Sequence, residues 1–348
     1  MAANEMRKDY LLNRWVVIAT HRRRRPTDFA KKPEEKPVGV CPLCPGNEHM
    51  TPPAVLVYLS SDGEIRKESD EDDFRHKEWL IRCVPNLYPA FTPPTPDKTK
   101  EVKETPTLAR ATGHHEVLVE SPIHDEHPSV ARVSQLTHVV NGWLDRLGDL
   151  SAKPYVKYVS IFRNYGQDAG ASLSHAHTQL ITTPFVPSII DEELKACKKF
   201  WTKNKKCVFC DILERERKGP RFTWENENFV VFAPWASVHP LEFWVFPKKH
   251  QPSLLGFSQA EAKALAKVLR LCFGGLRSLL NDPPYNFGFH IAPGNESQDF
   301  YHWHLEVYPK LAIWAGFEKS TGMFINLVSP EDAAASLSEA IHAEEEKI

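Results

Sequence analysis

The chain has 348 residues, enough for two domains of ordinary size or for one large duplicated domain. It is 42% hydrophobic and 25% charged, as expected for a globular protein that buries a substantial core. The formal net charge of −2 gives no overall positive field, so we expect no nucleic-acid partner. No stretch approaches the ~18 apolar residues of a membrane helix, and the first residues lack the apolar core of a signal peptide. These features predict a soluble, cytoplasmic protein with no membrane partner.

The first half of the chain alternates strand patterns with polar, proline-rich segments. Apolar and aromatic runs predict strands over 14–19, 116–120, 155–162 and 175–181, and helical periodicity predicts a helix over 134–150. The basic run 21–25 follows the first strand and is either a solvated loop or a loop that meets phosphate. The acidic segment 68–73 and the proline-rich segments 31–37 and 92–106 are expected to be loops at the surface.

The second half repeats this plan. It has strand patterns over 229–232, 241–246, 285–292 and 302–308, and a long helical pattern over 259–280. His124 precedes His175 by 51 residues, and His250 precedes His302 by 52. Each half also opens with its own Cys-x-x-Cys pair. The matching order and spacing predict duplication of one α+β unit, with halves at 1–187 and 188–348.

Four of the seven cysteines form two Cys-x-x-Cys pairs, and this pattern favours metal ligation in a reducing compartment over a disulfide framework. Structural zinc takes four tetrahedral thiolate and imidazole ligands. A redox pair is the alternative, but such a pair usually precedes a helix in a βαβ unit, a setting that we expect for neither pair. The sequence therefore predicts two zinc ions per chain, one held by Cys41, Cys44, His124 and His175, the other by Cys207, Cys210, His250 and His302.

The segment His175-Ala176-His177 carries a candidate nucleophile. Alternate residues of a strand share a face, so a metal that fixes His175 also holds His177 at a defined height. A neutral imidazole attacks phosphorus well and leaves well once phosphorylated. Gln179 follows on the same face, where its amide can donate to a phosphate oxygen. The alternative is that His-x-His is a second metal pair or simply a polar strand face.

A glycine-rich loop, 166–172, precedes this strand and strengthens the nucleophile hypothesis. Its backbone N–H groups and the Ser172 hydroxyl can bind an α-phosphate, and Asn164 can add an amide donor. A similar pair, His302 and His304, lies in the second half, but no comparable Gly/Ser loop stands before it. We therefore expect His304 to have a binding or structural role.

Motifs across nearly the whole chain resemble the galactose-1-phosphate uridylyltransferases of the histidine-triad superfamily, which include relatives similar to ADP-glucose phosphorylase. The motifs are Arg22-x-x-Arg25-Pro26, Cys41-Pro42-Leu43-Cys44-Pro45-Gly46-Asn47, Pro85-Asn86, Ser121-Pro122-x-His124, the block 164–179 and Gly316-Phe317-Glu318. The resemblance implies an α+β fold of two histidine-triad-like halves, with antiparallel sheets flanked by helices. It also implies a cytoplasmic homodimer that acts by a ping-pong route in galactose metabolism.

The same resemblance implies roles for individual residues. His177 matches the family's covalent histidine, and Cys41, Cys44, His124 and His175 match its zinc ligands. Positions that hold the nucleotide and its phosphates match Arg22, Arg25, Asn86, Asn164, Gly170, Ser172 and Gln179, and those near the sugar match Phe317 and Glu318. With Gln179 and Ser172 beside His177, the expected activity is a UDP-glucose–hexose-1-phosphate uridylyltransferase that uses a nucleotide-sugar and a sugar 1-phosphate.

Three other functions remain open: an ADP-glucose phosphorylase, a histidine-triad nucleotide hydrolase and a zinc-stabilised nucleotide-binding module without turnover. The chain also departs from the best-known bacterial relatives. Those bind a different metal near the second half, where this chain has Glu193, His290 and His304. A lysine and a glutamine that the family has near the sugar are absent here, and Ala312 and Phe324 lie in that part of the sequence. This departure counts against galactose 1-phosphate as the acceptor.

Overall fold

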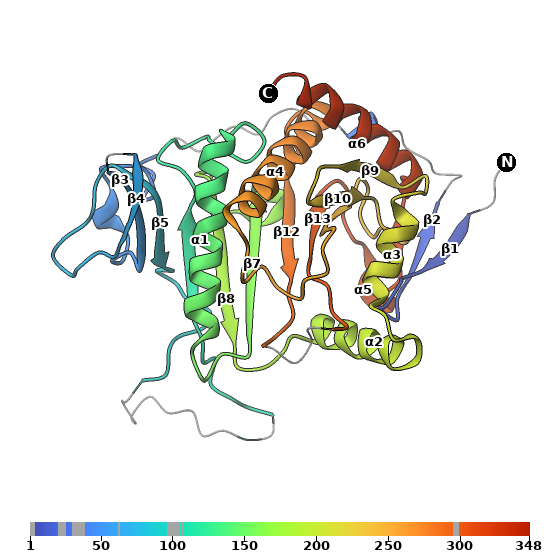
Figure 1. The fold of residues 1–348 in the computed structure, drawn as a ribbon, viewed down its shortest axis with the longest axis horizontal. Helices are drawn as coiled ribbons and strands as arrows, with labels where there is room; N and C mark the ends of the chain where they lie inside the picture. The colour runs from blue at the N-terminus through green and yellow to red at the C-terminus, as the bar shows by residue number, and fades with distance from the viewer. Residues whose placement is uncertain are drawn as a thin grey trace.

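A computed structural model describes residues 4–19, 26–29, 39–61, 63–95, 105, 107–294 and 299–348. Its main element is an eleven-stranded sheet in which every pairing is antiparallel (Figure 1). The strand order is β4 (Glu64–Glu68), β3 (Leu56–Ser61), β5 (Trp79–Pro85), β6 (His115–Val119), β8 (His177–Thr183), β7 (Tyr158–Tyr165), β12 (Tyr285–His290), β13 (His304–Pro309), β11 (Phe243–Pro247), β10 (Phe229–Phe232) and β9 (Phe222–Glu225).

A smaller sheet pairs two strands near the N-terminus with one strand near the C-terminus. In it, β2 (Trp15–Ile18) pairs with β1 (Glu5–Lys8) in antiparallel fashion and with β14 (Phe324–Asn326) in parallel. The helices are α1 (Val133–Ser151), α2 (Ser188–Asn204), α3 (Val208–Glu216), α4 (Gln259–Leu280), α5 (Gly316–Thr321) and α6 (Pro330–Glu345). None of the helices in the described ranges is long and apolar enough to cross a membrane.

The strand order is the same on both sides of the sheet's centre. Counting outward from β7, the strands are β8, β6 and β5; counting outward from β12, they are β13, β11 and β10. The two series meet where β7 pairs with β12, as Asn286 lies opposite Asn164. The α+β class with an antiparallel sheet flanked by helices is thus confirmed. The boundary between 187 and 188 stays a prediction, and the pairings β7–β12 and β2–β14 both cross it.

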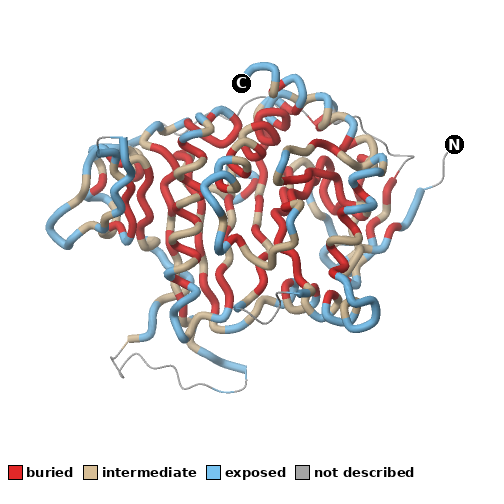
Figure 2. Tube along the Cα trace, viewed as in Figure 1, coloured by how far each residue is buried: buried red, intermediate tan, exposed pale blue. Residues whose placement is uncertain are grey.

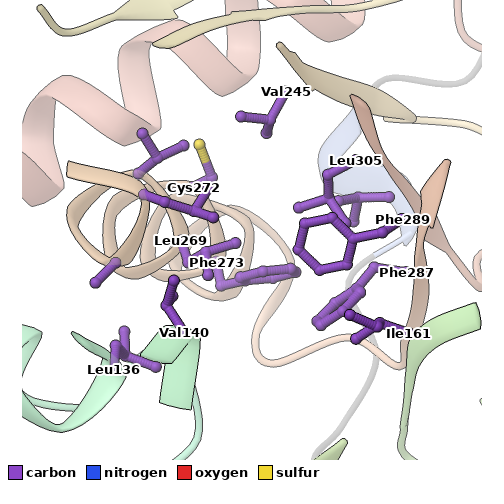
Figure 3. Close-up of a cluster of buried hydrophobic side chains, with 14 of the residues drawn as sticks. Leu136, Val140, Ile161, Val245, Leu269, Cys272, Phe273, Phe287, Phe289 and Leu305 are labelled. Atoms are coloured by element: carbon purple, nitrogen blue, oxygen red, sulfur yellow. The ribbon is translucent and has the colours of Figure 1, made fainter. Parts of the chain in front are cut away.

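Helices α1 and α4 cover one face of the large sheet and form the core with it (Figure 1). Helix α4 begins at a capping box between Ser258 and Glu261 and ends at Asn281, which adopts the left-handed conformation. Apolar side chains from both helices pack against alternate residues of the central strands (Figure 3). The labelled members of this core are Leu136, Val140, Ile161, Val245, Leu269, Cys272, Phe273, Phe287, Phe289 and Leu305.

The other face of the central strands carries polar side chains. Side chains alternate along a strand, so residues next to the core positions point away from the helices. These include Asn164 on β7, His177 and Gln179 on β8, and Asn286 on β12. The tube in Figure 2 shows that the middle of these strands is mostly buried. On this face His177 is buried, whereas Asn164, Gln179 and Asn286 are half-buried, so the fold holds several polar groups together on one side of the sheet.

The predicted elements differ from the structure mainly in their bounds. The helix predicted at 259–280 is correct to the residue, whereas β8 begins at His177 and β13 at His304, each two residues later than predicted. His175 therefore precedes the strand, and the prediction that both histidines share one strand face was wrong. Between the two histidines, the backbone N–H of Ala176 donates to the His124 carbonyl and the Ala176 carbonyl accepts from the Glu120 N–H.

Candidate active site and metal centres

His177 opens β8 and has one ring nitrogen committed to the backbone. Its Nδ1 lies 2.7 Å from the carbonyl oxygen of His175. A carbonyl oxygen can only accept, so Nδ1 carries the proton and Nε2 keeps its lone pair. The residue is only 6% exposed, and burial lowers the pKa of its ring. At neutral pH the ring is therefore neutral, with Nε2 able to act as a nucleophile.

Gln179 and Asn164 lie on the same face of the sheet as His177. Gln179 is two residues further along β8, and its Oε1 is 2.8 Å from Nε2 of His115. The Oδ1 of Asn164 accepts from Nδ2 of Asn286 at 2.8 Å. Neither His115 nor Asn286 was singled out from the sequence. The strand register brings each beside a predicted site residue, and one sequence without pairing information gives no signal for that.

The glycine-rich loop follows β7 and leads into β8. Gly166 and Gly170 have φ angles of 82° and 86°, which favour glycine, on either side of a short 3₁₀ helix (Gln167–Ala169). The amide of Ala171 returns to the Gly166 carbonyl, which closes the loop. An ideal Cβ on Gly170 would lie 4.0 Å from Nδ2 of Asn164, so this amide nitrogen faces the loop. Ser172 is exposed between the loop and β8.

The other predicted substrate residues have different outcomes. Asn86 joins the site through His115, because its Nδ2 lies 3.1 Å from the same Nε2 that contacts Gln179. Phe317 and Glu318 lie on α5, which packs beside β14 and is separated from β8 by several strands (Figure 1). The Glu318 carboxylate accepts from the amide of Ala315 at the start of that helix. Arg22 and Arg25 fall outside the described residues. These assignments all stay predictions.

A buried ion pair supports the strand beneath His177. Nη1 of Arg163 lies 2.5 Å from Oε2 of Glu120 and 3.1 Å from the carbonyl oxygen of His177. Nη2 of Arg163 contacts Nδ1 of His127 at 2.8 Å, and the Thr178 hydroxyl donates to Glu120. Arg163 and Glu120 are each 1% exposed. This network fixes the backbone of β8 at the residue whose ring is the candidate nucleophile.

Replacing Arg163 by methionine is expected to lower the free energy of unfolding by about 3–5 kcal/mol, because it leaves the Glu120 carboxylate buried and unpaired. Urea denaturation followed by circular dichroism measures this loss. The double variant Arg163→Met/Glu120→Gln should recover part of it. Lys195→Met removes the exposed pair with Asp191 and should change stability by less than about 1 kcal/mol. Equal losses for Arg163→Met and Lys195→Met would contradict the structural role of the buried pair.

The first predicted metal set converges on one point. The ligand atoms of Cys41, Cys44, His124 and His175 all lie within 4.8 Å of one another. Sγ of Cys44 is 3.3 Å from Nδ1 of His124 and 3.5 Å from Nδ1 of His175. The far nitrogens are bonded too: Nε2 of His175 to the Ser121 carbonyl at 2.8 Å, and Nε2 of His124 to the Ser174 hydroxyl at 2.9 Å. Two thiol and two imidazole donors, with the far nitrogen of each imidazole hydrogen-bonded to the protein, fit a zinc site.

The second set, Cys207, Cys210, His250 and His302, converges in the same way. Sγ of Cys210 lies 3.3 Å from Nδ1 of His250 and 3.6 Å from Nδ1 of His302. Hydrogen bonding from Cys210 lowers the pKa of Cys207 to about 5, which favours the thiolate that a metal needs. Both sets are therefore Cys₂His₂ candidate metal sites consistent with zinc.

The setting of the second Cys-x-x-Cys pair is not that of a typical redox pair. Cys207 is the N-cap residue of α3 and Cys210 lies in its first turn, so this pair does begin a helix. However, the preceding element is the helix α2 rather than a strand, so the setting is not a βαβ unit. The two histidine Nδ1 atoms directed at Cys210 favour metal ligation over redox chemistry.

A third group of potential ligands surrounds His304. Glu193, His290, His304 and Glu306 have ligand atoms within 4.8 Å of one another, and Nδ1 of His290 lies 2.9 Å from Glu193. Burial alone would lower the pKa of His290, but the two carboxylates outweigh it and raise the pKa to about 9. The structure thus brings together Glu193, His290 and His304, the three residues named from the resemblance to bacterial relatives. Glu306 is a fourth potential ligand, which was not named.

His304 makes the same backbone contact as His177, but its second ring nitrogen also has a partner. Its Nδ1 is 3.3 Å from the His302 carbonyl, and its Nε2 is 3.3 Å from Glu306, which occupies the position equivalent to Gln179. The ring is fully buried and stacks on Phe246. With both nitrogens engaged and the ring fully buried, His304 is poorly placed to act as a nucleophile, and its binding or structural role stays a prediction.

Comparisons with known proteins agree with this geometry. Residues 132–347 match a family model described as a domain of unknown function (DUF4921). The chain is 33% identical over 345 residues to the ADP-glucose phosphorylase of Arabidopsis thaliana, covering 96% of this chain and 92% of that protein. It is 31% identical over 344 residues to the galactose-1-phosphate uridylyltransferase of Thermotoga maritima, covering 96% and 98%.

Among solved structures, an ADP-glucose phosphorylase from Arabidopsis thaliana with bound ADP-glucose superposes with a TM-score of 0.78 at 29% identity, covering 97% of this chain and 99% of that one. Both the fold and the full length of the chain are therefore shared with these enzymes. The resemblance seen in the sequence motifs is confirmed. The chain belongs to the galactose-1-phosphate uridylyltransferase and ADP-glucose phosphorylase family, whose members are nucleotidyl-transfer enzymes.

Proposed function

We propose that this protein transfers a nucleoside monophosphate from a nucleotide-sugar to a second phosphate, with His177 as the covalent carrier. The observation that carries the proposal is the 2.7 Å contact between Nδ1 of His177 and the His175 carbonyl, which leaves Nε2 as the free nucleophile. Membership of a nucleotidyl-transfer family supports it.

The reaction consists of two displacements at one phosphorus atom. First, Nε2 of His177 forms a bond to the α-phosphorus while the bond to the sugar 1-phosphate oxygen breaks, and sugar 1-phosphate leaves. The ring becomes a nucleotidyl-imidazolium whose Nδ1–H remains bonded to the His175 carbonyl. An oxygen of the acceptor phosphate then attacks the same phosphorus, and the P–N bond breaks. Amides of Gln179 and Asn164, the Ser172 hydroxyl and the N–H groups of the loop 166–172 would bind the phosphoryl oxygens.

The zinc ions belong to this proposal as structural elements. The first Cys₂His₂ set includes His175, whose carbonyl fixes the His177 ring, so a metal there orients the nucleophile without touching the phosphate. A metal in the second set would link the start of α3 to His250, which follows β11, and to His302, which precedes β13. We propose two zinc ions per chain, bound by the eight residues of these sets.

We also propose that the active site is shared between two copies of the chain. Phe317 and Glu318 match sugar-contacting positions of the family, yet α5 lies on the far side of β12 and β13 from β8 (Figure 1). Phe317 is 44% exposed and the nearby Ile313 is 92% exposed, as expected of side chains that a partner would cover. In a homodimer, α5 of one protomer can complete the site of the other.

For the substrates, we propose UDP-glucose as donor and a hexose 1-phosphate, such as galactose 1-phosphate, as acceptor. The relatives named galactose-1-phosphate uridylyltransferase include bacterial and fungal proteins and support this choice. ADP-glucose with inorganic phosphate is the second candidate, favoured by the likeness to the Arabidopsis thaliana ADP-glucose phosphorylase in both sequence and fold.

Incubation of the protein with UDP-glucose and, separately, with ADP-glucose, followed by intact-mass measurement, tests nucleophile and nucleobase together. We expect one uridylyl adduct per chain from UDP-glucose, located on His177 by peptide mapping. An adenylyl adduct alone would replace the first candidate by the second. Labelling by neither nucleotide, or hydrolysis faster than transfer to an added sugar phosphate, would overturn the transferase proposal.

A further inference from the structure

Two amide side chains near His177 are held by hydrogen bonds whose direction is set by the backbone. We infer that His115 and Asn286 are positioning residues that turn the NH₂ groups of Gln179 and Asn164 toward the phosphates of the substrate. This inference rests on the proposed nucleotidyl transfer. Amide groups are ambiguous in isolation, because a flip exchanges donor and acceptor. Here each chain of contacts begins at a backbone group whose polarity is fixed.

The first chain starts at the backbone amide of Ala90. This N–H can only donate, and it reaches Nδ1 of His115 at 3.1 Å. In the neutral ring the proton is therefore on Nε2. That Nε2–H lies 2.8 Å from Oε1 of Gln179 and donates to it. The oxygen of Gln179 is thus occupied, and its NH₂ group is the part left to bind another acceptor.

The same tautomer explains the position of Asn86. Its Oδ1 accepts from the Tyr88 amide at 2.9 Å, so its Nδ2 is the atom that lies 3.1 Å from Nε2 of His115. Two donors face each other there, and no hydrogen bond forms between them. Asn86 therefore also has an NH₂ group in need of an acceptor. A phosphate or ribose oxygen bound beside His115 would supply one.

The second chain starts at the carbonyl of Ala169, in the loop before β8. A carbonyl can only accept, so the atom of Asn286 that lies 2.7 Å from it is the amide nitrogen. The second hydrogen of this NH₂ group goes to Oδ1 of Asn164 at 2.8 Å. The Nδ2 of Asn164 is then free to donate, and it faces Gly170. Asn286 lies on β12, so a residue in the second half of the chain sets the orientation of the Asn164 amide in the first half.

The charge of the ligand makes this orientation matter. Phosphate oxygens only accept, so an amide flipped by 180° would present an oxygen to an anion and repel it. Both amides lie on the sheet face that carries His177, on the adjacent strands β7 and β8. Their locked orientation stabilises the charged phosphoryl group without reorganisation during the reaction. Loss of one such charge-assisted hydrogen bond typically costs about 10- to 100-fold in rate.

The first test measures single-turnover formation of the His177 adduct with the nucleotide-sugar that labels the wild type. His115→Phe and Asn286→Leu should each slow it by about 10- to 100-fold, whereas His115→Gln, which keeps a nitrogen donor, should recover part of the rate. In a Gln179→Ala background, His115→Phe should have no further effect, and Asn286→Leu none in an Asn164→Ala background. His114→Phe is the matched control, because His114 bonds Tyr155 instead.

Additive losses in either double variant would overturn the inference, as would single variants that label at the wild-type rate. A second readout does not depend on activity. Nitrogen-15 NMR of histidine-labelled protein, with His115→Gln for assignment, should place the proton of the neutral His115 tautomer on Nε2. A ring protonated at Nδ1 would overturn the relay to Gln179. If neither nucleotide labels the wild type, the proposed function fails, while the tautomer still decides the orientation of Gln179.

Discussion

His177→Ala should abolish nucleotidyl transfer, with a loss of at least about 10⁴-fold in turnover, because it removes the ring on which the proposed covalent intermediate forms. The substitution removes a ring that is 6% exposed and whose Nδ1 is bonded to the His175 carbonyl. The backbone of β8 stays anchored by Arg163. We therefore expect a folded protein that binds nucleotide-sugar but forms no adduct and exchanges no label between donor and sugar 1-phosphate.

The matched control is His304→Gln, because His304 occupies the equivalent position in the second half. It contacts Glu306 through Nε2 and is fully buried, so its replacement can lower stability but should leave adduct formation intact. Intact-mass measurement of both variants after incubation with nucleotide-sugar separates the two histidines. Persistence of the adduct in His177→Ala, or its loss in a folded His304→Gln, would move the nucleophile to the second half.

The residues that could be predicted from the sequence are those whose spacing is local or repeated. The Cys-x-x-Cys pairs and the repeated histidine spacing were sufficient to propose both metal sets, and each set converges in the structure. Helix α4 was predicted to the residue from its helical pattern, and in the structure Ser258 and Glu261 cap its start and Asn281 its end. The α+β class followed from strand and helix patterns in both halves.

What could not be predicted depends on strand pairing. His115 meets Gln179 because β6 lies beside β8, and Asn286 meets Asn164 because β12 lies beside β7. Helix α3 was not predicted, because its N-cap and first turn hold the Cys-x-x-Cys pair, which we interpreted only as metal ligands. The distance between α5 and β8 is a further example. A family motif predicts that Glu318 contacts substrate, and the separation of α5 from β8 in the fold is the reason why we propose that a second protomer supplies this contact.

Cys44→Ser is expected to remove the first zinc and to damage both stability and catalysis. Cys44 is central to this site, since its Sγ lies within 3.5 Å of Nδ1 of both His124 and His175. A structural zinc site contributes on the order of 10 kcal/mol of apparent binding free energy, so losing one of four ligands should cost a large part of it. Metal analysis should find one zinc per chain in place of two, and the melting temperature should fall.

The loss of activity should exceed what reduced stability alone explains, because His175 is both a proposed zinc ligand and, through its carbonyl, the acceptor for Nδ1 of His177. Cys210→Ser provides the comparison: it should also lower the zinc content to one, yet slow adduct formation much less, since its site lies under α3 and contacts His302 rather than His175. Cys83→Ser, a buried thiol outside both sets, should leave two zinc ions. A folded Cys44→Ser variant that forms the adduct at the wild-type rate would show that the first metal does not hold the nucleophile. Equal slowing in Cys44→Ser and Cys210→Ser would instead show that zinc acts through overall stability.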